Sequence, residues 1–385
     1  MIQSVIGYLA YILGSAALIN YLVKKYPKKI FNFIPGIVII YVVTMLLYSL
    51  GLWEMNEDIT AARKFIQNNF TPAMVFLMCL TCNIKQILKL GPKLLMIFVV
   101  GAITVCIGFF VTFVTLGASQ PHAPEIFATV NSSYVGASQN FLATANALNM
   151  ADDAWGNLLL MVNIPYAFWI VLLVVFGNFA EKFNKWTGAS TDDIHAISAN
   201  LGEIGSKQYF DGNNIHIVLA LSVVAVWVAR TAANILPAIG FIDASVWEYI
   251  IVTVLGLILA PTPVGKTKGV DEVANFMVLF TITVSASYTN VLELMNAWVF
   301  VLAGFLALVI HGLLMAGCAK IFHWDLHSIL TASVANVGGP SSAPVVCGTY
   351  HKSYVSIGVL QACVGCIFGT LIGLCMNQVF LMFVR

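Results

Sequence analysis

The chain reads TVNSSYVGASQN from Thr129 to Asn140, where polar residues interrupt an otherwise apolar region. A second stretch reads TASVANVGGPSS from Thr331 to Ser342. At a constant offset of 202 residues, the two stretches share a Thr, a Val and a Gly. Upstream, Met74-Val75 returns as Met277-Val278. These identities indicate that the chain has two related halves, each with one polar interruption.

The amino-acid composition indicates whether water or lipid surrounds the chain. Of 385 residues, 60% are hydrophobic and only 9% are charged, whereas a soluble protein carries about 25% charged residues. So few charges cannot cover a water-exposed surface, and we predict a polytopic membrane protein whose main partner is the lipid bilayer. The 18 basic and 17 acidic residues also leave no basic surface for nucleic acid.

Segments of about 20 apolar residues can cross a bilayer as helices. Ten such segments are predicted, at about 2–23, 30–52, 70–88, 92–117, 153–180, 213–237, 245–264, 273–293, 297–318 and 354–382. The two interrupted stretches, about 122–150 and 327–350, are predicted to be re-entrant. With this topology nearly all Lys residues lie on the cytoplasmic side, as the positive-inside rule requires. Both termini are then expected outside, and the expected location is the cell membrane.

The order of segments also repeats, and this predicts the fold class. We expect an all-α membrane protein with two inverted five-span repeats, each containing a Gly/Ser-rich re-entrant or broken element. The first repeat covers 1–180, a cytoplasmic linker covers 181–212, and the second repeat covers 213–385. Five crossings per half place the second half upside down relative to the first, an arrangement typical of secondary transporters.

The two interruptions are the candidate binding site. Irregular backbone at membrane depth requires a protein-lined cavity, and helix N-termini there attract anions. Freed carbonyls and side-chain oxygens suit a hard cation such as Na⁺. Gly136 and Gly338 are expected to supply positive φ or close backbone approach. The candidate substrate- and ion-binding residues are Asn131, Ser132, Ser133, Gly136, Ser138, Gln139, Asn140, Ser333, Asn336, Gly338, Gly339, Ser341 and Ser342. Alternatively, these Ser and Asn residues only join helices to one another.

Titratable groups inside the spans are few. The acidic residues fall in loops or at segment ends, which disfavours a proton antiporter that uses carboxylates. His311 could carry a proton or be an inert packed residue, and Arg230 could bind a substrate carboxylate or snorkel to the interface. The Cys residues in the spans are interpreted as packing residues. Gly365, Gly369 and Gly373 permit close helix contact, either within the monomer or between protomers.

The stretches Ser133-Tyr134-Val135-Gly136-Ala137-Ser138-Gln139-Asn140-Phe141 and Ala335-Asn336-Val337-Gly338-Gly339-Pro340 resemble the paired signatures of a widespread bacterial family of integral membrane proteins of unknown function. That family is distantly similar in architecture to sodium/glutamate, 2-hydroxycarboxylate and bile-acid symporters. The resemblance implies paired five-span repeats and elevator movement of a core against a scaffold. Those symporters tend toward Gly-Gly-x-Gly at both interruptions, and this chain departs from that pattern in both.

The sequence therefore predicts a Na⁺-coupled secondary transporter of a small anionic organic solute, such as a carboxylate or an amino acid. We expect an elevator mechanism, with a core at 70–180 and 273–382, and a homodimer. No enzymatic activity and no cofactor besides the coupling ion are expected. The alternatives are a proton-coupled transporter, an exporter and a passive channel or facilitator. An intramembrane enzyme is disfavoured because no nucleophile–base pair is visible.

Overall fold

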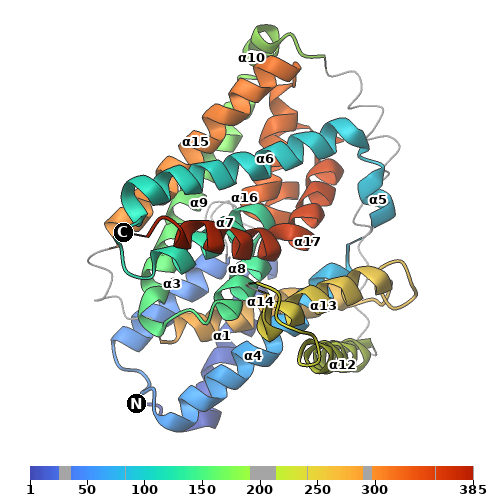
Figure 1. The fold of residues 1–385 in the computed structure, drawn as a ribbon. Helices are drawn as coiled ribbons and strands as arrows, with labels where there is room; N and C mark the ends of the chain where they lie inside the picture. Colours follow the sequence, from blue (N-terminus) through green and yellow to red (C-terminus); the bar gives the residue numbers. More distant parts are fainter. Residues whose placement is uncertain are drawn as a thin grey trace. The chain divides into compact units, whose positions relative to one another are not determined.

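The computed structural model describes residues 1–25, 36–82, 84–190, 214–240, 242–288, 297–351 and 353–384. In these ranges the regular structure is helical, apart from two isolated β-bridges (Figure 1). The helices of the first half are α1 (Val5–Lys25), α3 (Gly36–Ser49), α4 (Glu57–Leu80), α5 (Ile84–Leu88), α6 (Gly91–Thr112), α7 (Ala123–Gly136), α8 (Ser138–Ala147), α9 (Trp155–Gly177) and α10 (Ala180–Thr187). Those of the second half are α12 (Ile215–Ala233), α13 (Ala244–Leu259), α14 (Val270–Ala286), α15 (Trp298–Phe322), α16 (Leu326–Tyr350) and α17 (Ser353–Leu381).

Six helical segments among the described residues are long and apolar enough to cross a membrane. They lie at Val5–Leu22, Gly91–Gly117, Asp152–Gly177, Ile215–Ala233, Trp298–Phe322 and Tyr354–Leu381. Two further apolar helices, Ile39–Ser49 and Ala244–Leu259, are shorter. The helical fold class and several helices that are apolar and long enough to cross a membrane are thus observed, while the ten-span inverted topology stays a prediction.

Helix α4 begins earlier than the sequence predicts. The expected span started near residue 70, but the helix starts at Glu57, after Asn56 caps it by accepting a hydrogen bond from the Ile59 N–H (2.9 Å). Glu57 and Asp58 in the first turn add favourable charge at the helix N-terminus. As a consequence Arg63 lies on a helix, although it falls between the spans predicted at 30–52 and 70–88.

The chain forms two compact units, and each takes segments from both halves of the sequence. Unit 1 contains Met1–Thr81, Ala145–Leu159 and Tyr209–Trp298, and unit 2 contains Cys82–Thr144, Leu160–Gln208 and Val299–Arg385. Helices α4 and α14 belong to unit 1, although the sequence assigned the C-terminal part of α4 and most of α14 to the expected core. Among the described helices, one unit therefore contains α1, α3 and α4 of the first half with α12, α13 and α14 of the second, and most of the others belong to the second unit.

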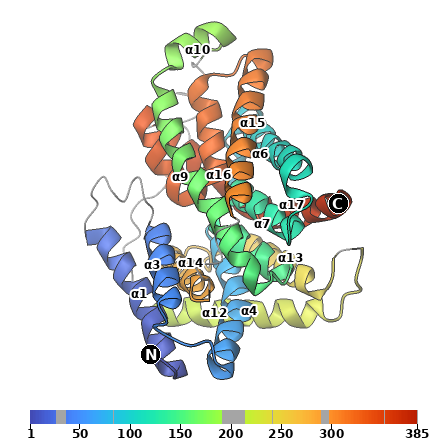
Figure 2. The same ribbon diagram turned by 90° about the vertical axis from the view of Figure 1, so that its left-hand side faces the viewer.

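Unit 1 is held together by a cluster of buried apolar and aromatic residues. Helix α14 packs on α1, α3 and α4, and α4 packs on α12 and α13 (Figure 2). Tyr8 on α1 reaches Ser287 at the end of α14 with a 2.7 Å hydrogen bond between the two hydroxyls. Trp53 donates its indole N–H to the Ser287 carbonyl (2.7 Å). These bonds satisfy the polar tips of aromatic residues whose rings fill the core.

Unit 2 is built around the two interrupted stretches. Helix α17 packs on both α7 and α16, and α16 also packs on α6 and α7. Phe113 and Phe380 stack with ring centroids 4.6 Å apart, next to Phe127 on α7. Of the expected linker 181–212, the structure describes α10, where Lys185 contacts Glu181 (2.8 Å), and the three residues after it. Residues 191–213 lie outside the described ranges.

Candidate functional site

Both interrupted stretches are helices with a single break. In the first, α7 ends at Gly136, Ala137 has φ 75° and ψ −173°, and α8 begins at Ser138. In the second, Gly339 inside α16 has φ 65° and ψ −165°. The breaks therefore fall at equivalent positions of the two stretches and share one backbone conformation. The positive φ occurs one residue after Gly136 and Gly338, so those two glycines do not supply it. The close backbone approach expected at Gly136 is observed, since a Cβ there would lie 2.5 Å from the Gly365 carbonyl oxygen.

The two breaks are in contact with each other inside unit 2. A Cβ atom built on Gly339 would lie 2.1 Å from the Cβ of Ala137, which leaves no space for a side chain at position 339. The N-terminus of α8 and the helical turn after Gly339 both start at this contact. The first N–H groups of a helix have no partner within the helix, so the contact concentrates backbone donors and carbonyls in a buried place.

Helix α17 approaches the first break through its glycines. A Cβ on Gly365 would lie 2.1 Å from the Val135 carbonyl oxygen, and one on Gly369 would lie 2.9 Å from the Gly136 Cα. Gly373 faces Ser132 in the same way. The glycine series thus serves a contact within the monomer, which settles the choice that the sequence left open.

Several candidate residues of the first break are occupied by structural hydrogen bonds. The Asn140 amide donates to the carbonyls of Gly136 (2.7 Å) and Gly365 (3.3 Å) and accepts from the Thr370 hydroxyl (2.7 Å). The Ser132 hydroxyl donates to the Asn140 carbonyl (3.1 Å) and accepts from Thr144 (2.7 Å). These partners make Asn140 and Ser132 residues that join α8 to its neighbours.

Candidate residues of the second break also contact aromatic side chains of α9. Ser333 accepts a hydrogen bond from the Trp169 indole (3.0 Å), and Ser342 shares one with the Tyr166 hydroxyl (2.5 Å). The Gln139 amide of the first break contacts the Cys366 sulfur. Gly338 is buried next to Ser342. The Ser341 side chain lies outside the described part of the structure.

Three buried polar atoms near the breaks have no hydrogen-bond partner among the described residues. They are the Thr129 hydroxyl oxygen, the Asn131 amide nitrogen and the Asn336 amide oxygen. The Asn336 amide nitrogen, in contrast, donates to the carbonyls of Ala332 (2.9 Å) and Phe98 (3.2 Å). Because an unpaired buried polar atom is costly, a ligand or water is expected to satisfy these groups. Ser133 and Ser138 lie on the two sides of the same break, on α7 and α8.

His311 is a fully hydrogen-bonded residue of unit 2. Its Nδ1 lies 2.8 Å from the Thr104 hydroxyl, and its Nε2 lies 2.9 Å from the Ser333 hydroxyl. Thr104 donates its proton to the Gly101 carbonyl (2.8 Å) and so accepts from His311. Ser333 then donates to Nε2, and the ring is neutral with its proton on Nδ1. This geometry agrees with the interpretation of His311 as a packed residue.

Two other charged residues differ from expectation. Arg230 forms two hydrogen bonds with the Glu248 carboxylate (2.8 and 3.0 Å) and one with Asn69 (2.8 Å). Arg230 is therefore paired with a carboxylate of this chain, while its side chain stays 40% exposed. Asp325 caps α16 and is completely buried, with one carboxylate oxygen bound by Tyr354 (3.1 Å) and the other without a partner among the described residues.

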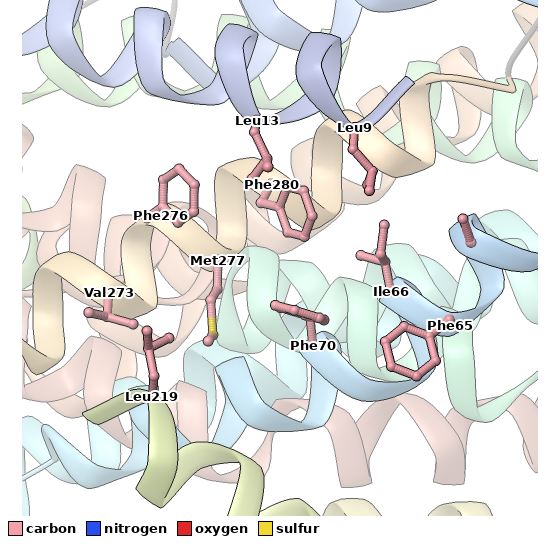
Figure 3. Close-up of a pocket in the computed structure, with 11 residues that line it drawn as sticks. Leu9, Leu13, Phe65, Ile66, Phe70, Leu219, Val273, Phe276, Met277 and Phe280 are labelled. Carbon is pink, nitrogen blue, oxygen red and sulfur yellow. The ribbon is translucent and has the colours of Figure 1, made fainter. Parts of the chain in front are cut away.

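An apolar groove lies in unit 1, and it contains no chemistry for a polar solute. Leucine and phenylalanine side chains of α1, α4, α12 and α14 point toward one another there (Figure 3). The groove has a volume of about 360 Å³ and includes Leu13, Phe70, Leu219 and Phe276.

A polar cavity in the same unit was missed by the sequence analysis. It has a volume of about 350 Å³, and Arg63, Gln67, Asn146, Asp152 and Tyr288 are among the residues that line it. Arg63 and Gln67 are four residues apart on α4 and so share one helix face. The capped helix start at Asn56 was the signal that could have placed Arg63 on that face.

Comparison with known proteins agrees with a membrane location and gives no activity. The chain is 23% identical over 338 residues to the uncharacterized membrane protein YjcL of Bacillus subtilis (strain 168). That similarity covers 80% of this chain and 81% of the relative. Residues 10–383 match a family described as a protein of unknown function, DUF819. The chain therefore belongs to the DUF819 family of membrane proteins.

Proposed function

We propose that this protein is a secondary active transporter of a small anionic organic solute, coupled to Na⁺. The observation that carries the proposal is the contact between the two helix breaks at Ala137 and Gly339. Two helix N-termini at this contact would attract the anionic group of the solute. Carbonyl and amide oxygens nearby, above all the unpartnered Asn336 oxygen, would bind the cation.

The ten-span inverted topology is part of the proposal. Its support is the offset of 202 residues between the breaks, which have the same φ and ψ region. The matching order of helices in the two halves adds to this support, as does the resemblance to sodium symporters of several families. In this arrangement both termini are outside the bacterial inner membrane.

An elevator mechanism would use the two compact units as its two bodies. Unit 2 contains both breaks and would carry the solute, while unit 1 would remain fixed and form the homodimer contact. Transport would then exchange two packings of the repeats. We assign transport to this site and propose no enzymatic reaction there.

A proton-coupled transporter is the second candidate, and one observation favours it. The buried Asp325 carboxylate has an oxygen without a partner among the described residues, and a buried carboxylate can exchange a proton during transport. Asp325 fits this task better than His311, whose ring nitrogens both have partners.

Melting temperature distinguishes the two candidates without knowledge of the solute. Purified protein is heated in NaCl and in KCl at equal ionic strength, alone and with a panel of carboxylates and amino acids. Ligand at a hundred times its Kd stabilises by about 2.7 kcal/mol, so Na⁺ coupling predicts a higher melting temperature in NaCl. Equal melting temperatures across the panel would contradict Na⁺ coupling and favour proton coupling or a passive channel.

A further inference from the structure

We propose that the polar cavity around Arg63 is a binding site for a small organic carboxylate. The residues of this cavity belong to unit 1, whereas the helix breaks belong to unit 2. The inference does not rest on the proposed transport function, because it concerns equilibrium binding to other residues.

The cavity holds a buried cation. The Arg63 side chain is only 4% exposed, and its guanidinium lies over the Tyr288 ring, 3.9 Å from the ring centroid. Its Nε is buried without a hydrogen-bond partner among the described residues. A guanidinium binds a carboxylate through two parallel N–H donors, which makes arginine the preferred residue for a buried ion pair.

The anion that now neutralises Arg63 is easily reached by solvent. Asp152 binds both terminal nitrogens of Arg63 (2.8 and 3.1 Å), yet the Asp152 side chain is 63% exposed. It belongs to a single turn of 3₁₀-helix before α9. A carboxylate from solution can occupy the same two donors when that short turn moves aside.

The walls of the cavity supply the remaining contacts. The Gln67 side-chain oxygen accepts a hydrogen bond from Arg63 (3.4 Å), and the Gln67 amide nitrogen donates one to the Tyr288 hydroxyl (3.1 Å). The proton of the Tyr288 hydroxyl can therefore be donated to a ligand. The Asn146 amide nitrogen donates to the Gln67 backbone carbonyl (2.8 Å), and Asn146 also lines the cavity. Lys64 also lines the cavity, and Asp153 lines an adjoining pocket that shares Arg63, Asp152 and Tyr288 with it. The buried guanidinium of Arg63, rather than the net charge, favours an anionic ligand.

The alternative is that Arg63 and Asp152 form only a structural clamp. In that case the loss of Asp152 lowers stability, and no added anion restores it. Binding predicts chemical rescue, since a free carboxylate takes the empty place on the guanidinium.

The test compares melting temperatures of Asp152→Asn in sodium acetate and in sodium chloride at equal ionic strength. We expect a lower melting temperature in chloride than for the unchanged protein, with at least half of the loss regained in acetate. Glu248→Gln is the matched control, because it breaks another two-pronged ion pair of unit 1, and Arg230 does not line the cavity. Acetate should not rescue that control.

A second measurement covers the case in which Asp152→Asn does not fold. Titration calorimetry with succinate should show binding to the unchanged protein and at least tenfold weaker binding to Arg63→Lys, which keeps the charge but loses the two-pronged geometry. Equal rescue by chloride and acetate, equal rescue of both variants, or equal succinate binding by the unchanged protein and Arg63→Lys would each overturn the carboxylate site.

Discussion

Gly339 has no space for a methyl group because the Cβ of Ala137 occupies that place, 2.1 Å from where a Gly339 Cβ would be. Both residues have positive φ and extended ψ, a combination that essentially only glycine adopts without strain. The two broken helices therefore contact each other at the two residues whose backbone conformation is strained for any residue except glycine. One break uses glycine there, and the other uses alanine under strain.

Gly339→Ala is expected to destabilise unit 2, since it adds both a clash and a strained φ. The strained backbone alone costs about 1–3 kcal/mol. Thermal unfolding should show a clear decrease in melting temperature. Gly317→Ala on α15 is the control, because nothing lies within 4 Å of its added Cβ. An unchanged melting temperature for Gly339→Ala would show that the breaks are not in contact.

Ala137→Gly should be neutral or stabilising by about 1 kcal/mol, although glycine in general costs conformational entropy. The reason is that glycine adopts the observed φ of 75° without strain. The same substitution should also restore part of the stability that Gly339→Ala loses, because it removes the Cβ that causes the clash. Strict additivity of the two changes would contradict this coupling.

Gly365→Ala is expected to separate α17 from α7. A methyl group there would lie 2.1 Å from a backbone carbonyl oxygen, which cannot rotate away as a side chain can. We expect a loss of folded protein or a large decrease in melting temperature, measured by size-exclusion chromatography and heating. Gly14→Ala on α1 has free space around its Cβ and should behave as the unchanged protein.

Asn336→Ala should remove the increase in melting temperature that Na⁺ causes. The Asn336 oxygen is the unpartnered amide oxygen closest in sequence to the second break. Asn377→Ala is a suitable control, since Asn377 is also buried on a helix of unit 2 with an unpartnered oxygen. If both variants keep the response to Na⁺, the ion does not bind at Asn336.

His311→Gln should leave the response to Na⁺ intact. A Gln amide can donate and accept as the neutral imidazole does between Thr104 and Ser333. Under proton coupling, Asp325→Asn would abolish proton-driven uptake in vesicles and His311→Gln would not. Loss of uptake in His311→Gln alone, with normal expression, would assign the proton to the histidine.

The repeat predicted where the chain breaks, because Gly, Ser and Pro in apolar sequence signal an interruption. It could not tell which residue has positive φ, since this depends on the packing of Ala137 against Gly339. Nor could it show that the side-chain amide of Asn140 is hydrogen-bonded within the protein, because its partners Gly365 and Thr370 lie more than 200 residues away in the sequence. Hydropathy also gave no indication that Arg63 lies on a helix, since a charged residue near a span end is usually assigned to a loop.

Each compact unit contains segments from both halves of the chain, and this affects how the protein folds during synthesis. Unit 1 needs α14 and unit 2 needs α17, so neither can be completed until most of the chain has left the ribosome. A nascent chain that stops at the linker would expose the faces of α4 and α7 that later helices cover. Such a chain should be a substrate for membrane quality-control proteases, and separately expressed halves should persist only when both are made in the same cell.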